Sequence, residues 1–142
     1  MKDKTYSVLI ADDDPLIRQV LRLLLRGSEY DVIGEAANGD AALAMVQSLQ
    51  PDFVLLDIKM PGLDGLDVLK RLRDMMMSAH IIIVSADSTS DKVQRAVAYG
   101  ADGYIIKPFN AGVVLDAFER CLSAPDPRPP QERESRPAPE KP

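Results

Sequence analysis

Short apolar runs recur along the chain, and most of them end in a polar residue. The runs are Tyr6 to Ala11, Val32 to Ala36, Phe53 to Leu56, His80 to Val84 and Tyr104 to Ile106. Short, mostly uninterrupted apolar runs are typical of strands that are buried on both faces, as in a parallel sheet. The pattern therefore predicts five β-strands.

The segments that separate and follow these runs carry apolar residues at helical spacing. Asp14-Pro15 is typical of a helix start, Asn110 is a further candidate cap, and Asn38-Gly39 forms a turn into the second helix. Gly27 is placed to end the first helix. The stripes expected to face inward are Leu16, Val20, Leu23 and Leu24; Ala42, Met45, Val46 and Leu49; Leu66, Leu69 and Leu72; Val93, Ala96 and Val97; and Val114, Leu115, Phe118 and Leu122.

Alternating strands and helices predict an α/β fold, a doubly wound five-stranded parallel sheet with helices on both faces. The strand order 2-1-3-4-5 of flavodoxin-like folds suits five strands, with its switch point between the first and third strands. In such sheets the functional site lies beyond the carboxyl ends of the strands.

The composition changes abruptly near the C-terminus. Residues 124–142 contain seven of the eleven prolines and almost no apolar residues. Such a segment cannot bury enough surface to offset the entropy of ordering it. We therefore expect one domain over residues 1–123 and a proline-rich disordered tail or linker over 124–142.

Charge and cysteine content narrow the class of protein. The net charge of −5 argues against nucleic-acid binding through a basic surface, and a single cysteine, Cys121, excludes an internal disulfide. No signal peptide is visible, and no apolar run approaches the roughly 20 residues that span a bilayer. The expectation is a cytoplasmic protein without membrane or direct nucleic-acid contacts.

Chemically active side chains follow four of the predicted strands. Asp12 and Asp13 follow the first, Asp57 the third, Ser85 the fourth and Lys107 the fifth. Like charges about 4 Å apart repel by roughly 4 kcal/mol at a protein-like dielectric, so three carboxylates need a compensating cation. Mg²⁺ fits this need, and a carboxylate beside it can act as a nucleophile toward a phosphoryl group. A lysine and a hydroxyl are suited to stabilise the transferred group. Lys107-Pro108 is also a candidate cis peptide bond.

These segments resemble the receiver domain of bacterial two-component response regulators. The resemblance covers residues 6 to about 122 and rests on "VLIADDDPLIR", "VLLDIKMPGLDGLDVLKRL", "IIIVSA" and "GADGYIIKPF". It implies the receiver fold and makes Asp57 the phospho-acceptor. It also implies Mg²⁺ as cofactor, with Asp13 as a direct ligand, Asp12 binding or orienting the metal, Asp57 itself, and the backbone carbonyl of Lys59.

The resemblance extends to residues that respond to the phosphoryl group. It makes Lys107 the phosphate-contacting cation, Ser85 the hydroxyl that follows the phosphoryl group, and Tyr104 the aromatic switch residue. Lys59 and Asp87 match positions that flank the route of the attacking water. We expect these two to approach each other at the rim of the site and partly cover the phosphoryl group.

The implied function is that of a phosphorylation-activated switch in a two-component phosphorelay. A sensor histidine kinase or phosphotransfer protein would phosphorylate Asp57, and the switched surface would bind a downstream effector or a second copy of the chain. The protein would catalyse its own Mg²⁺-dependent phosphorylation and dephosphorylation, without turning over an external substrate.

Two other readings of the same residues stay open. Asp12-x-Asp14 with Ser85 and Lys107 resembles the motif of haloacid-dehalogenase-type phosphatases, although the further acidic pair and cap domain of those enzymes are not visible. Alternatively, the chain is the receiver part of a longer transcription factor, with the tail as its linker, although no helix-turn-helix follows.

Overall fold

The computed structural model describes residues 4–123, and it contains the five strands and five helices that the pattern predicts. The second strand begins at Tyr30, two residues earlier than expected, because its first residues pair with Tyr6 and Ser7 of the neighbouring strand. In chain order the elements are β1 (Tyr6–Ala11), α1 (Pro15–Leu25), β2 (Tyr30–Ala36), α2 (Gly39–Leu49), β3 (Phe53–Leu56), α3 (Gly65–Asp74), β4 (His80–Ser85), α4 (Ser90–Ala98), β5 (Gly103–Ile106) and α5 (Ala111–Ser123).

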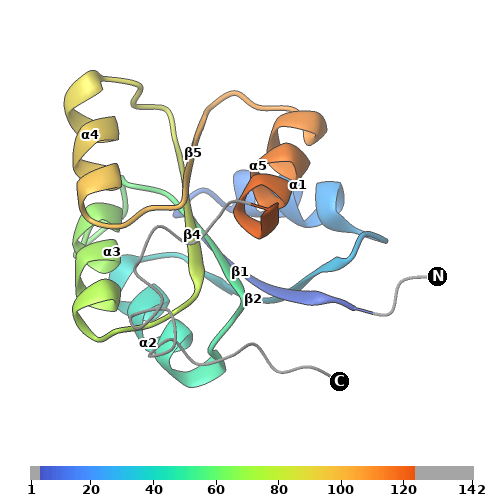
Figure 1. Ribbon diagram of the computed structural model, residues 1–142, viewed down its shortest axis with the longest axis horizontal. Helices are drawn as coiled ribbons and strands as arrows, with labels where there is room; N and C mark the ends of the chain where they lie inside the picture. The colour runs from blue at the N-terminus through green and yellow to red at the C-terminus, as the bar shows by residue number, and fades with distance from the viewer. Residues whose placement is uncertain (1–3, 124–142) are drawn as a thin grey trace.

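The strands form one parallel sheet in the predicted order β2-β1-β3-β4-β5 (Figure 1). Backbone hydrogen bonds continue just past the strand ends. The N–H of Asp12 donates to the carbonyl of Ala36 at 3.0 Å, and that of Asp57 donates to Ala11 at 2.9 Å. The N–H of Lys107 donates to Ser85 at 2.9 Å. The sheet ladder itself therefore fixes the backbone at the positions that carry the candidate site.

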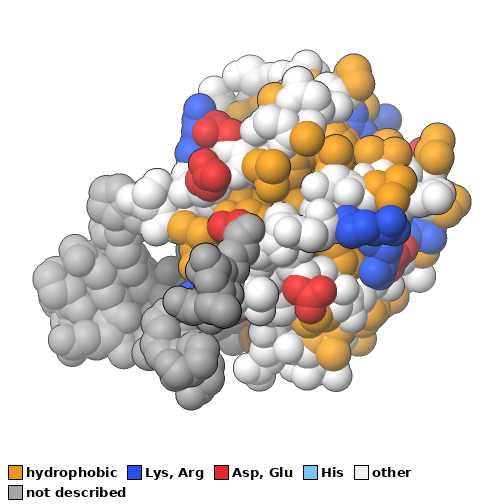
Figure 2. Space-filling view, turned by 90° about the vertical axis from the view of Figure 1, so that its right-hand side faces the viewer, with side chains coloured by type: hydrophobic (Ala, Val, Ile, Leu, Met, Phe, Trp, Pro, Cys, Tyr) orange, Lys and Arg blue, Asp and Glu red, His pale blue; other side chains and the backbone are white. Residues whose placement is uncertain are grey.

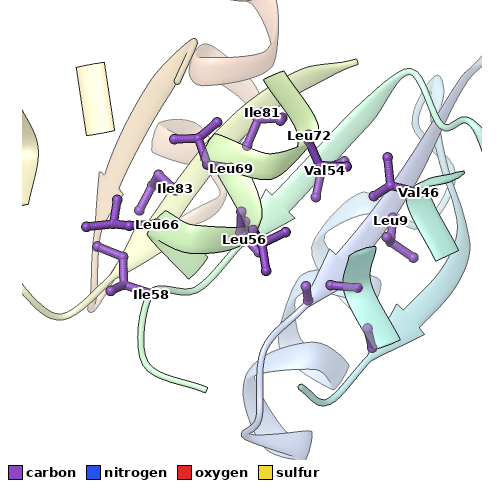
Figure 3. Close-up of a cluster of buried hydrophobic side chains, with 14 of the residues drawn as sticks. Leu9, Val46, Val54, Leu56, Ile58, Leu66, Leu69, Leu72, Ile81 and Ile83 are labelled. Atoms are coloured by element: carbon purple, nitrogen blue, oxygen red, sulfur yellow. The ribbon is translucent and has the colours of Figure 1, made fainter. Parts of the chain in front are cut away.

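The helices cover the two faces of the sheet and enclose two separate hydrophobic clusters. Helices α2, α3 and α4 pack on one face, and α1 and α5 pack on the other (Figure 1). Neighbouring residues along β1 point to opposite faces, so Leu9 belongs to the first cluster and Val8 and Ile10 to the second. Figure 3 shows the first cluster, in which Leu66, Leu69 and Leu72 of α3 lie over β3 and β4, as expected.

Helix α1 is rotated from the orientation that the sequence predicted. Its fully buried residues are Leu21 and Leu25, whereas Leu16 is 63% exposed and Leu23 is 50% exposed. Seven of the eleven residues of this helix are Leu, Ile or Val, so apolar spacing alone fits more than one rotation. Hydrophobic side chains consequently reach the surface on the side of the molecule that carries α1 and α5 (Figure 2).

Three other residues expected to face inward are largely exposed. Val97 of α4 is 64% exposed, and Leu49 and Leu122 lie in the last turns of α2 and α5 with about two fifths of their surface exposed. Ala96 is the buried residue of α4. The predicted stripes are therefore longer, or in α4 wider, than the faces that these helices bury.

Within residues 4–123, no helix has the length and apolar character needed to cross a membrane. The proline-rich segment 124–142, predicted to be a disordered tail, lies outside the described residues.

Candidate functional site

Three carboxylates meet at the carboxyl edge of the sheet. Asp12 follows β1 and Asp57 follows β3, and both are almost fully buried, at 2% and 5% exposure. Asp13 is exposed. One oxygen from each of the three carboxylates lies within 4.8 Å of the others. The prediction that the parallel sheet brings these residues together is confirmed.

Lys107 reaches the same cluster from β5. Its Nζ donates to Oδ2 of Asp12 at 2.8 Å and to Oδ2 of Asp57 at 3.3 Å. Burial lowers the pKa of the ammonium, but the hydrogen bond to Asp12 and the negative charges of Asp57 and Asp12 outweigh burial and raise it. Lys107 is therefore a cation at neutral pH. The peptide bond between Lys107 and Pro108 is cis, as expected.

The carboxylate of Asp57 is under electrostatic stress. Burial and the neighbouring charge of Asp12 raise its pKa, and Lys107 offsets only part of the increase. A carboxylate that is desolvated beside a like charge is a feature of functional sites more often than of stabilising ion pairs.

The donor set fits a hard divalent cation. It consists of three carboxylates from two adjacent strand ends, with Asp13 open to solvent and Asp12 and Asp57 behind it. One ammonium group faces this acidic cluster directly. Cations of this kind prefer a few carboxylate oxygens and retain waters or phosphate oxygens as further ligands.

The predicted switch residues are joined through the backbone of Asp87. Ser85 is buried, and its Oγ accepts a hydrogen bond from the N–H of Asp87 at 3.1 Å. The hydroxyl of Tyr104 donates to the carbonyl of the same residue. Displacement of the Ser85 hydroxyl would therefore disturb Asp87, to which the Tyr104 hydroxyl is hydrogen-bonded.

The predicted rim residues Lys59 and Asp87 line one cavity of about 370 Å³ beside the acidic cluster. Among the described residues no ion pair of 4.0 Å or less joins them. The Asp87 carboxylate instead accepts from the N–H and hydroxyl of Thr89, which caps α4. These two bonds lower the pKa of Asp87 most, with smaller effects from Lys92 and Lys59.

Two glycines beside the site allow close backbone approach. A Cβ on Gly65 would lie 2.1 Å from the carbonyl oxygen of Asp57, and one on Gly39 would lie 1.8 Å from that of Leu63. The side chain of Asp64 caps α3 by accepting from the N–H of Asp67. The sequence gave no sign that Gly65 lies against the backbone of Asp57.

Sequence reasoning also missed Arg18. Its Nη1 donates to the backbone carbonyl of Asp12 at 2.7 Å, and its Nε pairs with Glu35 of β2 at 3.0 Å. The sequence shows only that Arg18 and Arg22 are four residues apart and so lie on one side of a helix; that both face Glu35 is seen only in the structure.

Comparison with known proteins identifies the family. Residues 8–119 match the response regulator receiver domain. The chain is 36% identical over 118 residues to the nitrate/nitrite response regulator NarL of Escherichia coli, covering 82% of this chain and 55% of NarL. It is 38% identical over 118 residues to the chemotaxis protein CheY of Halobacterium salinarum, covering 83% of this chain and 98% of CheY. The chain thus spans about half the length of NarL and almost all of CheY.

Solved structures agree with this assignment. The receiver domain of the putative response regulator NarL from Mycobacterium tuberculosis has a TM-score of 0.80 at 32% identity, covering 86% of this chain and 99% of that one. CheY in the CheX–CheY–BeF3–Mg²⁺ complex of Borrelia burgdorferi has a TM-score of 0.80 at 27% identity, covering 84% and 90%. With its acidic pocket of Asp12, Asp13 and Asp57 facing Lys107, the chain belongs to the receiver domains of two-component response regulators.

Proposed function

We propose that Asp57 accepts a phosphoryl group from a phosphohistidine or a small acyl phosphate, and that the resulting aspartyl phosphate switches a partner-binding surface. Receiver domains are generally non-enzymatic signalling domains that partner with histidine kinases and effectors. The observation that carries the proposal is a nearly buried carboxylate with Lys107 Nζ at 3.3 Å and two further carboxylates within 4.8 Å.

The proposed cofactor is Mg²⁺, held by Asp12, Asp13 and Asp57 with the backbone carbonyl of Lys59. The CheX–CheY complex of Borrelia burgdorferi contains both Mg²⁺ and BeF3. When bound, the ion offsets the repulsion among the carboxylates and the negative charge of the phosphoryl oxygens. Asp13 is the exposed member of the cluster, so an ion would meet this carboxylate first on its way from solvent.

In the proposed reaction a carboxylate oxygen of Asp57 attacks phosphorus. The new P–O bond forms as the donor's P–N or P–O bond breaks, and the leaving group departs with the electron pair. The ammonium of Lys107 and the hydroxyl of Ser85 donate to the phosphoryl oxygens as their charge is redistributed. Hydrolysis reverses the modification when water attacks phosphorus, which releases phosphate and restores the carboxylate.

The proposed switch begins at Ser85 and ends at Tyr104. When the Ser85 hydroxyl turns to the phosphoryl group, its hydrogen bond with the N–H of Asp87 is lost. The Tyr104 hydroxyl, which donates to the carbonyl of Asp87, then has a displaced partner. Asp87 lies two residues before the Thr89 cap of α4, so the change reaches the start of that helix. A local charge change thereby biases a surface element.

The partners are inferred from the family. We propose a sensor histidine kinase or phosphotransfer protein as donor, and an effector protein or a second copy of the chain as the reader. The curated relative NarL is about twice the length matched here, so an output carried by another domain of a longer protein is compatible with the proposal.

The direct test is Asp57→Asn, which keeps the shape of the side chain and removes the nucleophile. We expect the native chain to gain one phosphoryl group from acetyl phosphate with Mg²⁺, and the variant to gain none, by intact-mass spectrometry. EDTA should also abolish the gain. Lys107→Ala should leave at most weak phosphorylation, because the phosphoryl oxygens lose their ammonium partner.

Two outcomes would contradict the proposal. Phosphorylation of Asp57→Asn at the native rate would place the acceptor elsewhere. Release of many equivalents of phosphate per chain from an added phosphate ester would instead indicate the phosphatase reading. Circular dichroism of each variant provides the control for folding.

A further inference from the structure

Arg18 connects the acidic cluster to the edge strand of the sheet. From α1 its guanidinium donates to the Asp12 carbonyl at 2.7 Å and pairs with Glu35 of β2 at 3.0 Å. We propose that Arg18, held by Glu35, is a positioning residue that fixes the Asp12–Asp13 peptide and so sets the affinity of the cluster for a divalent cation. The inference rests on the proposed function of the same site.

Asp12 is held at every polar group. Its N–H donates to Ala36, its Oδ1 accepts from the N–H of Asp14 at 2.9 Å, and its Oδ2 accepts from Lys107. Its carbonyl accepts from Arg18, and this carbonyl belongs to the same peptide as the N–H of Asp13. Arg18 therefore holds the peptide plane that determines the direction in which the Asp13 side chain leaves the backbone.

The position of Asp13 needs such a restraint. Asp13 is exposed and carries the same charge as its two buried neighbours, so repulsion favours its movement toward water. A cation must then bear the cost of bringing it back. If the peptide is fixed in advance, that cost is removed from binding, which is how residues behind metal ligands commonly raise affinity.

Glu35 makes the orientation of Arg18 specific. The hydrogen bond from Arg22, opposed by burial and assisted by Arg18, lowers the pKa of Glu35, which keeps it ionised at neutral pH. Glu35 lies opposite Ile10 in the sheet register, so its backbone is fixed by the ladder. With Nε on this carboxylate and Nη1 on a carbonyl, the planar guanidinium has two anchors that a lysine cannot match simultaneously.

Arg22 provides a matched control. It pairs with the other oxygen of Glu35 but has no bond to Asp12. If the three residues only hold α1 against β2, Arg18→Ala and Arg22→Ala should affect the binding of a cation to a similar extent, even though Arg18→Ala costs more stability. If Arg18 positions the cluster, only Arg18→Ala should change the binding of a cation.

The experiment is titration of Mg²⁺ into the full chain by isothermal titration calorimetry, without any phospho-donor. We expect Arg18→Ala to raise the Mg²⁺ dissociation constant about tenfold, in the range found when residues behind metal ligands are removed. Glu35→Gln and Arg18→Lys should give smaller increases, because each keeps one of the two anchors. Arg22→Ala should stay within about twofold of the native value, well below that range.

A second readout separates positioning from stability. In the absence of Mg²⁺, the ¹⁵N–¹H resonance of Asp13 should shift and its amide should exchange faster with solvent in Arg18→Ala than in Arg22→Ala. Thermal midpoints measured without Mg²⁺ should fall more in Arg18→Ala, which loses the bond to Asp12 as well as the ion pair with Glu35, than in Arg22→Ala, which loses only the ion pair. The Asp13 resonance and the Mg²⁺ affinity, compared at a temperature where both variants are folded, report positioning separately from this loss.

Equal Mg²⁺ affinities in Arg18→Ala, Arg22→Ala and the native chain would overturn the positioning role and leave the proposed function standing. Equal losses of affinity in the two variants would also overturn it, in favour of a role in stability alone. A native chain that does not bind Mg²⁺ would overturn both proposals.

Discussion

The two edges of the sheet use carboxylates in opposite ways. At the edge where the strands begin, Asp52 accepts from the N–H of Ser7 at 2.8 Å, and Asp102 accepts from the N–H of Ile81 at 2.8 Å. Each of these carboxylates thus fixes the backbone near the start of a neighbouring strand, β1 or β4. At the edge where the strands end, Asp12 and Asp57 share one ammonium and repel each other.

The difference is visible in the pKa directions of two carboxylates, one at each edge: Asp102, which is partly exposed, and Asp57, which is buried. Burial alone would raise the pKa of Asp102, but His80, the N–H of Ile81 and the guanidinium of Arg73 outweigh burial and lower it. For Asp57, burial and Asp12 raise the pKa despite Lys107. The carboxylates at the starting edge therefore stabilise the fold. Those at the carboxyl edge repel each other, and a bound cation can offset that repulsion.

The largest expected effect on stability comes from replacing Gly65, a glycine at the carboxyl edge. Gly65→Ala should lower the free energy of unfolding by about 3 kcal/mol or more, because the new Cβ would lie 2.1 Å from the Asp57 carbonyl oxygen. Urea denaturation measures this loss. The phosphorylation rate with acetyl phosphate should fall as well, since the backbone of Asp57 must move.

The matched control is Gly103→Ala at the starting edge. Its Cβ would meet Ile82 at 3.5 Å, which is ordinary van der Waals contact. We expect a change within about 0.5 kcal/mol and native phosphorylation. A similar loss of stability in both variants would mean that the close approach of Gly65 to the Asp57 carbonyl is not what makes this glycine necessary.

A smaller pair of effects should have opposite signs. Without Mg²⁺ at pH 7, Asp102→Asn should lower the free energy of unfolding by about 1–3 kcal/mol, because hydrogen bonds to a charged acceptor are weakened. Asp57→Asn should raise it by about 1 kcal/mol, because a stressed charge is removed. Denaturation in urea with EDTA tests both. Effects of the same sign would break the comparison.

The pH dependence sharpens this prediction. The pKa of Asp102 is lower in the folded chain than its ordinary value of about 3.9. Its stabilisation is therefore complete above about pH 4 and is lost as the pH falls through the folded-state pKa. The difference in the free energy of unfolding between the native chain and Asp102→Asn should therefore become smaller as the pH is lowered over that acidic range. A constant deficit would mean that the charge of Asp102 contributes nothing.

The smallest expected effect concerns the rim of the carboxyl edge. Asp87→Asn removes the charge opposite Lys59 but keeps an oxygen that can accept from Thr89. If the pair partly covers the phosphoryl group, the half-life of phosphorylated protein should shorten by less than about fivefold, because attraction within an exposed pair is weak. Decay after removal of the donor measures it, with Thr89→Val as the control for the helix cap. Unchanged decay in Asp87→Asn would leave both side chains merely solvated.

The site was predictable because its signal is local. Asp12, Asp57 and Lys107 each follow an apolar run directly, and parallel pairing brings such positions to one edge. The helix caps at Asp14 and Asn110 followed from equally short segments. The strand order followed from the alternation of strands and helices along the whole chain.

The rotation of α1 and the role of Arg18 were not predictable in this way. The role of Arg18 depends on Glu35, which is 17 residues away and on another element. The rotation of α1 depends on which of its many apolar residues pack against the sheet. An arginine on a helix with apolar residues on most sides has the same local pattern whether it faces solvent or a carbonyl. The apolar ends of α2 and α5 failed for a related reason, since exposure there depends on where the sheet stops.

The sheet also divides the interior of this small domain into two compartments. Val8 and Ile10 contact one cluster, Leu9 and Ala11 the other, and the backbone of β1 lies between them. Residues that share no neighbours usually have additive effects on stability. A substitution in one cluster therefore does not have to be matched by a packing change in the other. The two halves of the interior can change in sequence at different rates while the sheet between them is kept.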